Sequence, residues 1–333
     1  MTLLPRMPLL SPALATIIAG LYMSAALAAP SDSWRYEWPK TDFTMTSVDL
    51  TEIFSGGPPK DGIPAIDDPS FAAIGDVDIP DIEPVIGFGV GDDMRAYPLR
   101  VLMWHEIVND VVGGIPVAVT FCPLCNAAMV FDRRVDGQVL DFGTTGKLRH
   151  SDLIMYDRQS ESCWQQFLGE AIVGSMTGKR LKLLPARIES FAKFRARAPQ
   201  GKVLVPGFSL FRSYGENPYE GYDSLASPWL YRGDMPANIA PLARVVTVGG
   251  EAWSLDLLRQ VRTIEKGDMV ITWEPGQASA LDTSIIANGF DVGNVTVQRR
   301  TAGGEMEDIA YGVDFAFAFS AFYPDAPIHL EAP

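Results

Sequence analysis

Short apolar runs separated by turn residues begin at Val85 and continue through most of the chain. The segment VIGFGVGDDMRAYPL predicts a β-hairpin, because two strand-like runs flank a Gly-Asp turn. The next segment, RVLMWHEIVNDVVGG, has apolar residues at helical spacing and ends in two glycines, which predicts a helix. CPLCN predicts a tight turn, and the segments around it predict strands: IPVAVTF, AAMVFDRR, GQVLDFGTT and DLIMYDR.

The same layout recurs about 150 residues later, in a segment that includes VVTVGGEAWSLDLLRQV. Three ordered matches support the comparison. Ala96–Leu99 aligns with Ala252–Leu255, Val119–Pro123 aligns with Ile271–Pro275, and Phe131-Asp132 aligns with Phe290-Asp291. The alternative is a coincidence between short strand patterns. We expect an internal duplication. The predicted fold class is α+β and predominantly β, in one compact domain over residues 81–325, with two related hairpin–helix–strand units at about 85–135 and 244–292.

Three segments lie outside these units. Prolines punctuate residues 29–80, which predicts an irregular N-terminal wrap. Residues 206–236 are rich in Tyr, Gly and Pro without a period, so they form either a binding loop or lid, or a plain surface insertion. The tail DFAFAFSAFYPD predicts a strand that places Phe315, Phe317 and Phe319 on one buried face.

Residues 1–28 have the features of a cleavable signal peptide. Arg6 precedes an apolar run, and Ala26-Leu27-Ala28 fits a small-residue cleavage site. The alternative is an uncleaved N-terminal anchor. We expect a periplasmic or extracellular protein with no membrane span after signal cleavage. The net charge of −14 argues against nucleic acid and anionic lipid as partners.

Cysteine is rare, yet two of the three cysteines, Cys122 and Cys125, lie two residues apart on one predicted turn. Three interpretations are open: a metal-binding knuckle, a thioredoxin-like redox pair, and a structural disulfide or pair of buried thiols. Three cysteines exclude a four-cysteine metal site. A mixed site with sulfur and imidazole suits copper or zinc, and the residues that could complete it are His105, Glu106, His150, Met155 and Cys163.

Two polar groups of residues accompany the cysteines. In WHEIVND, a helix would place His105 and Asn109 one turn apart, and likewise Glu106 and Asp110. We expect His105 to be the nitrogen ligand, Glu106 a supporting or labile ligand, and Asp110 an orienting group; the alternative is a structural histidine with solvated acids. The second group follows Arg149, and its members are His150, Asp152, Met155, Tyr156, Asp157, Arg158 and Glu161. Of these, His150, Met155 and Asp157 are candidate additional ligands.

Three motifs, YPLRVLMWHEIVND, VTFCPLCNAAMVFDR and SDLIMYDRQSESCWQQ, occur in this order. With them the chain resembles the domain of unknown function 3179 family, which is common in bacterial and archaeal proteins with export signals. The resemblance covers residues 80 to 325. Two positions depart from the family pattern: Asn126 stands where Gly is usual, and His150 stands where Asn is usual, which weakens His150 as a ligand. The resemblance implies boundaries and motifs but no activity.

The sequence thus favours an exported protein that binds copper or zinc through Cys122, Cys125 and His105. An open coordination position under residues 206–236 would allow catalysis, but the sequence does not decide whether the protein is an enzyme, and its partner is an unknown small molecule or metal ion. One alternative is a thiol–disulfide oxidoreductase that uses Cys122 and Cys125. The other is a non-catalytic structural or ligand-binding protein.

Overall fold

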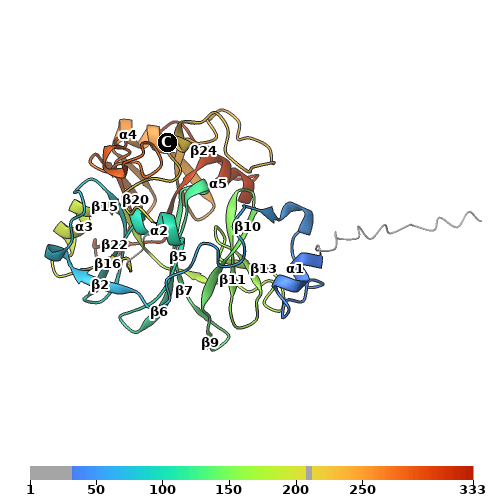
Figure 1. Cartoon of the computed structure of the whole chain (residues 1–333). Coiled ribbons are helices and arrows are strands. Elements are labelled where there is room, and N and C mark those ends of the chain that lie inside the picture. Colours follow the sequence, from blue (N-terminus) through green and yellow to red (C-terminus); the bar gives the residue numbers. More distant parts are fainter. Residues whose placement is uncertain (1–31, 208–211, 333) are drawn as a thin grey trace, which may run out of the picture.

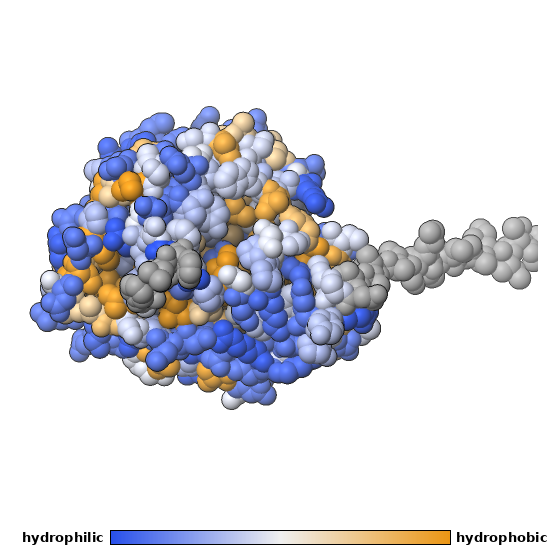
Figure 2. Space-filling model, viewed as in Figure 1, coloured by the Kyte–Doolittle hydropathy of each residue, from blue (hydrophilic) through white to orange (hydrophobic). Residues whose placement is uncertain are grey.

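A computed structural model describes residues 32–207 and 212–332. The predicted signal peptide, residues 1–28, lies outside the described residues. The fold is predominantly β, with 39% strand and 16% helix, and five small sheets form a propeller-like ring (Figure 1). This strand content confirms the prediction of a mainly β fold. The face shown in Figure 2 is mostly hydrophilic, with scattered apolar patches.

Two of the sheets carry the candidate site. The first, called here the cysteine sheet, has the strand order β14 (Lys182–Leu183), β7 (Ala127–Asp132), β6 (Ile115–Cys122), β5 (Ile107–Val112). The second, called here the aspartate sheet, has the order β1 (Phe54–Ser55), β10 (Phe142–Arg149), β11 (Asp152–Asp157), β12 (Cys163–Gln165), β13 (Glu170–Val173).

The other three sheets complete the ring. One has the order β15 (Arg187–Ser190), β3 (Pro84–Val90), β4 (Asp93–Pro98), β16 (Lys202–Val205), β2 (Ser70–Ala73). The next has the order β23 (Gly312–Phe315), β17 (Arg244–Val248), β18 (Glu251–Ser254), β24 (Ile328–His329). The last has the order β19 (Thr263–Lys266), β20 (Met269–Glu274), β21 (Asn294–Arg300), β22 (Met306–Asp308). A separate pair joins β8 (Arg134–Val135) to β9 (Gln138–Val139).

The helices are short. The part of the chain that the structure describes has five α-helices: α1 (Asp32–Glu37), α2 (Leu99–His105), α3 (Phe191–Arg197), α4 (Leu255–Val261) and α5 (Ala316–Phe322). Single 3₁₀ turns occur at η1 (Leu50–Glu52), η2 (Ile74–Asp76), η3 (Pro123–Cys125), η4 (Tyr222–Ser224) and η5 (Ile286–Asn288). No helix within the described residues is both long enough and apolar enough to cross a membrane.

Two stretches of the chain have the same order of elements. The hairpin β3–β4 leads into α2 and then β5, β6 and β7; the hairpin β17–β18 leads into α4 and then β19, β20 and β21. Both helices end at a residue with positive φ, Glu106 at 57° and Arg262 at 69°. The fourth strand of the first stretch, β6, ends at Cys122, and its counterpart β20 ends at Glu274.

Two predicted elements were wrong. The helix expected to run to the glycine pair ends at His105, and Ile107–Val112 is instead strand β5, which pairs with β6 along its full length. His105 and Asn109 are therefore not one helical turn apart. The tail expected to be a strand changes to helix α5 after Phe315. Phe315, Phe317 and Phe319 are fully buried, as expected, but Ala316 and Ala318 are buried too.

The N-terminal segment 32–80 crosses the aspartate sheet with few regular elements. Its contact with β10 is close at Gly146, which has φ 67° and whose missing Cβ would lie 1.9 Å from the carbonyl oxygen of Pro58. Gly137 also has positive φ, 79°, but a Cβ there would meet no atom within 4 Å. A side chain at Gly137 would therefore meet backbone strain alone, whereas a side chain at Gly146 would meet both backbone strain and a steric clash.

Replacing Gly146 with Ala is therefore expected to lower the free energy of unfolding by about 3 kcal/mol or more, from the left-handed backbone and the clash together. Gly137→Ala keeps the backbone cost alone and should lose about 1 kcal/mol. Urea denaturation of both variants measures the difference. Equal losses would show that the Pro58 contact does not constrain the segment.

Candidate metal centre

The cysteine pair lies on the turn that joins β6 to β7. Cys122 is the last residue of β6, and Pro123 begins a single 3₁₀ turn that ends at Cys125. Asn126 then takes the left-handed conformation, φ 52°, which Asn and Gly tolerate best. Its side-chain amide donates to the carbonyl of Val313 at 2.6 Å and so ties the turn to β23. The turn brings both sulfurs to one side.

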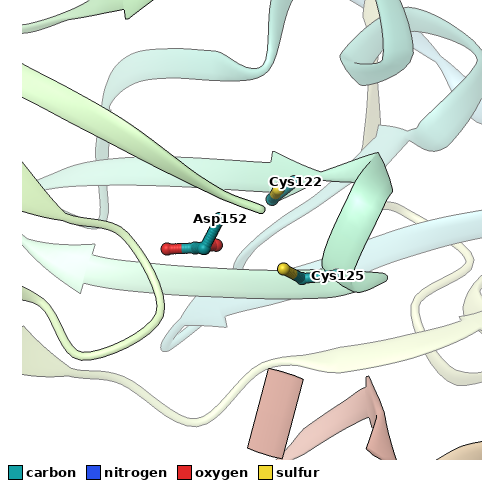
Figure 3. Close-up of side chains that lie close together, drawn as sticks. All are labelled: Cys122, Cys125 and Asp152. Carbon is teal, nitrogen blue, oxygen red and sulfur yellow. The ribbon is translucent and has the colours of Figure 1, made fainter. Parts of the chain in front are cut away.

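Asp152 reaches this turn from the neighbouring aspartate sheet. It is the first residue of β11, opposite Arg149 of β10 in a two-residue hairpin. The two turn residues, His150 and Ser151, both have positive φ, 53° and 64°, as tight type I′ hairpins require. The hairpin thus directs the Asp152 carboxylate toward the cysteines (Figure 3).

Cys122, Cys125 and Asp152 form a compact, buried group. One ligand atom from each residue, two sulfurs and a carboxylate oxygen, lie within 4.8 Å of one another. The exposed fractions of the three residues are 2%, 0% and 0%. All three cysteines of the chain are free thiols, so no disulfide joins Cys122 to Cys125. Two sulfurs and an oxygen at this spacing match a single metal ion of the zinc or copper type.

Buried acceptor atoms around this group lack donors. One oxygen of Asp152, Oδ2, accepts from Gln165 Nε2 at 2.6 Å and from the amide of Phe167 at 2.9 Å. The other oxygen, Oδ1, has no hydrogen-bond partner within the described residues, and neither do Gln165 Oε1, Gln166 Oε1 and Asp314 Oδ1. Because an unpaired buried acceptor costs free energy, this region needs hydrogen-bond donors, from protonated carboxyl groups or water, or a cation.

Burial and mutual repulsion raise the pKa values of the group. Burial raises the pKa of both thiols above the ordinary range, and the neighbouring Asp152 charge raises both further. Burial also raises the pKa of Asp152 to about 7, although its hydrogen bonds act in the opposite direction. The pKa of Asp314 rises to about 7, through burial and through Asp152. Without a cation the two thiols hold their protons at neutral pH, and the two carboxyl groups titrate close to it.

Glu106 is a third buried carboxylic acid in this region, in addition to Asp152 and Asp314. It is 8% exposed, and burial together with the Asp152 charge raises its pKa to about 8. Its carboxylate forms no hydrogen bond within the described residues, yet it lines a cavity of about 200 Å³ that also reaches Cys122. Glu106 therefore faces open space next to a cysteine, with no protein partner to hold it.

Residues of the 206–236 segment form part of the wall of this cavity. Tyr219, Trp229 and Leu230 line it, and the Tyr222 hydroxyl donates to the carbonyl of Leu124 in the cysteine turn at 2.9 Å. The Ser151 hydroxyl donates to the carbonyl of Trp229. The part of the 206–236 segment that the structure describes thus contacts both the cysteine turn and the Asp152 hairpin.

His105 does not join the three converging residues. Its Nδ1 lies 2.8 Å from the carbonyl oxygen of Pro64, and its Nε2 lies 2.9 Å from the Tyr214 hydroxyl. A carbonyl can only accept, so Nδ1 carries the proton and Nε2 accepts from Tyr214. Burial lowers the pKa of His105, which keeps the ring neutral. Its role as the nitrogen ligand stays a prediction, and it would require breaking the bond to Tyr214.

The remaining predicted residues have other contacts. The two carboxylate oxygens of Asp110 accept from Arg95 Nη1, at 2.7 and 2.8 Å, and Oδ2 also accepts from the Tyr97 hydroxyl at 2.6 Å. Asp157 accepts from Trp164 Nε1 at 2.9 Å and from Ser160. His150 lies 3.7 Å from Glu52, and Met155 is fully buried in the apolar core. None of the four belongs to the group of three.

Sequence reasoning did not select two residues of this region. The sequence places Asp152 among the polar residues that follow Arg149, but nothing in the pattern marks it as a ligand, and no motif includes Asp314. The signal for Asp152 was its place directly after a His-Ser turn at a strand start. For Asp314, the only signal in the sequence is a single acidic residue directly before an apolar run.

The comparison with protein families gives one match. Residues 60–326 match the family model described as "Protein of unknown function (DUF3179)". No match was found among curated proteins or among solved structures. The family match covers most of the chain, including all three residues of the group. The chain therefore belongs to the DUF3179 family of proteins of unknown function.

Proposed function

We propose that this protein binds a transition metal ion at Cys122, Cys125 and Asp152. The observation that carries the proposal is the convergence of two thiols and a carboxylate within 4.8 Å at a buried position. A dication there would offset two of the three negative charges of the two thiolates and the carboxylate, and it would supply the partner that Asp152 Oδ1 lacks. Three protein ligands leave a fourth position open, as catalytic zinc sites do.

Of copper and zinc, zinc fits this set of donors better. A carboxylate oxygen is a hard ligand that zinc accepts readily, whereas cuprous copper prefers sulfur alone. The thioether that the sequence offered as a ligand, Met155, is fully buried in the apolar core. Zinc is therefore our first candidate and copper the second.

A thiol–disulfide oxidoreductase is less well supported. Reactive thiols have a lowered pKa and are partly accessible, often at a helix N-terminus. Here both thiols are buried and their pKa values are raised. A strand, β7, follows the second cysteine instead of a helix. The surroundings thus favour inert or metal-bound sulfur over redox exchange.

We also propose that the two stretches with the same order of elements arose by duplication. The matched positions are Cys122 and Glu274, each the last residue of its strand, followed by Pro123 and Pro275. The second stretch lacks both cysteines, so the scaffold does not depend on them. The metal-binding residues would then be an addition to one of two related units.

We further propose that the protein acts in the periplasm or outside the cell. Arg6, the apolar run and Ala26-Leu27-Ala28 support a cleavable signal peptide. N-terminal sequencing of the protein from its own host tests this proposal, and a mature N-terminus near Ala29 is the expected result.

Elemental analysis of the purified protein tests the metal proposal. We expect about one equivalent of zinc or copper in the wild type, and a loss of most of it in Cys122→Ser and Cys125→Ser. Cys163→Ser is the matched control, because Cys163 is a free thiol on β12 that is not part of the group. It should keep the wild-type metal content. Equal metal loss in all three variants, or none in any, would reject the site.

A further inference from the structure

A small, largely apolar cavity lies against the proposed metal site on the side of Cys122. Its volume is about 200 Å³, and Cys122 and Glu106 form part of its wall. Most of the remaining wall is apolar, with Ile63, Leu148, Leu153 and Trp229 among its residues. Ligand pockets of drug size measure about 300–1,000 Å³, so this cavity suits a smaller molecule.

The charges at the cavity do not favour an anion. Glu106 and Lys147 are its charged wall residues among those that the structure describes. The Lys147 ammonium is held 3.0 Å from Glu37 and lies 4.5 Å from the ring centroid of Trp38, so its charge is already paired. With a dication bound, the two thiolates and the Asp152 carboxylate leave a net negative charge at the site, and an ionised Glu106 adds to it. An uncharged ligand avoids this repulsion, whereas a carboxylate would meet it directly.

The surroundings of Glu106 differ from those of a structural acid, because its side chain is buried without a hydrogen-bond partner among the described residues and faces a cavity. Buried carboxylates elsewhere in this fold have partners, as Glu83 does in its ion pair with Arg100. The Glu106 side chain is buried, forms no hydrogen bond within the described residues, and lines the cavity. The equivalent turn residue of the other stretch, Arg262, stacks over Trp273 at 4.3 Å. Both stretches have a positive-φ residue after their helix, and it is an acid without a side-chain hydrogen bond only in the stretch that contains the cysteines.

Backbone conformations that cost free energy gather around the same place. Ten non-glycine residues in the described part of the chain have positive φ, and five of them flank the site or its cavity: Glu106, Asn126, His150, Ser151 and Leu230. Leucine has little tendency to adopt this conformation, and Leu230 does so at φ 55° on the cavity wall. Such conformations persist where surrounding structure holds them, and they concentrate at functional sites.

We propose that the cavity is the substrate pocket of a metal-dependent hydrolase for small uncharged esters, with Glu106 as the group that accepts the proton of the attacking water. This proposal rests on the proposed metal site, which would polarise the water or the carbonyl group. It assigns Glu106 a catalytic role next to the ligands, in place of the supporting role expected from the sequence.

The reaction balances without any further reactant. Water loses a proton to the Glu106 carboxylate, and its oxygen forms a bond to the carbonyl carbon of the ester. The tetrahedral intermediate then breaks its bond to the alcohol oxygen, and Glu106 returns the proton to that oxygen. The products are a carboxylic acid and an alcohol.

Hydrolysis of 4-nitrophenyl butyrate by the metal-loaded protein tests the proposal. We expect turnover above the level of metal-free Cys122→Ser, and a loss of about 100-fold in kcat/KM for Glu106→Gln with its metal content unchanged. Glu52→Gln is the matched control, because Glu52 is a surface acid paired with Arg149 outside the cavity. The anionic analogue 4-nitrophenyl hydrogen succinate has a similar length and should be hydrolysed at least about 10-fold less efficiently.

The outcomes separate the two proposals. A wild-type protein that binds no metal rejects the metal site. A metal-loaded protein that is no faster than Cys122→Ser, or a Glu106→Gln variant as active as the wild type, rejects the hydrolase and leaves the metal site standing. Equal rates for the two esters would reject the charge argument for the cavity and with it the proposed substrate class.

Discussion

Metal affinity is expected to fall by about 10⁴-fold between pH 8 and pH 6. Metal binds thiolates, and burial raises the pKa of Cys122 and Cys125 above the ordinary value, so both thiols are protonated throughout this range. Binding must release both protons, which makes the association constant change by about 100-fold per pH unit. Asp152, with a pKa of about 7, releases a third proton at the lower end of the range and steepens the loss.

Competition with a chelator of known pH dependence measures this slope. Calorimetry in two buffers of different ionisation enthalpy counts the released protons, and we expect between two and three per metal ion near pH 7. Asp152→Asn removes one titrating ligand, so its slope below pH 7 should be shallower and its affinity lower at every pH. An affinity that does not change with pH would show that the thiols do not ligate the metal.

The predominantly β fold could be predicted because its evidence is local. The longer strands, such as β6, β7 and β11, show their own apolar runs, and turn residues mark the hairpin that became β3–β4. The Cys-Pro-Leu-Cys turn was also predictable, since strand residues flank it and Pro123 fits the first position of a tight turn.

The helix after that hairpin was predicted too long for a physical reason. Ile107, Val108, Val111 and Val112 fit helical spacing, but β-branched residues also favour strands. Pairing with β6, a partner that comes later in the chain, decides between the two. The error in the tail is the reverse: a strand was predicted where the chain forms helix α5. Residues 315–319 are all buried, so their pattern shows neither the helical nor the strand period.

The candidate site followed from the sequence only in part. The cysteine pair is local, but its third member comes from another sheet. The approach of β11 to the β6–β7 turn depends on how sheets pack in the ring, and no sequence spacing encodes that distance. His105 seemed the natural partner because it precedes the cysteines on an expected helix; the early end of α2 leaves it bonded to Pro64 and Tyr214.

The metal-free protein is expected to become more stable as the pH falls from 8 to 6. Burial raises the pKa of Asp152 and Asp314 from 3.8 to about 7, and that of Glu106 from 4.5 to about 8. Between about pH 4 and pH 8 the folded state therefore holds protons that the unfolded state has released. Stability must then rise as the pH falls through this window.

The size of this effect is several kcal/mol. A shift of about three pKa units in one buried acid corresponds to roughly 4 kcal/mol. The three acids repel one another, so their contributions do not simply add, and only part of the window lies between pH 8 and pH 6. A gain of about 3 kcal/mol, or an increase of several degrees in Tm, is the expected result. The histidines with lowered pKa, His105 and His150, act in the opposite direction only below about pH 6.5.

Thermal unfolding of chelator-treated protein at pH 8, 7 and 6 measures the slope. Asp314→Asn removes one of the buried acids without removing a proposed ligand, so it should flatten the slope and raise Tm at pH 8. With saturating metal the sign should reverse, because protonation displaces the ion and the stability that binding confers is lost. A metal-free protein whose Tm falls from pH 8 to pH 6 would contradict the view that this cluster is held protonated, and would imply that its carboxylates are ionised and solvated in the folded state.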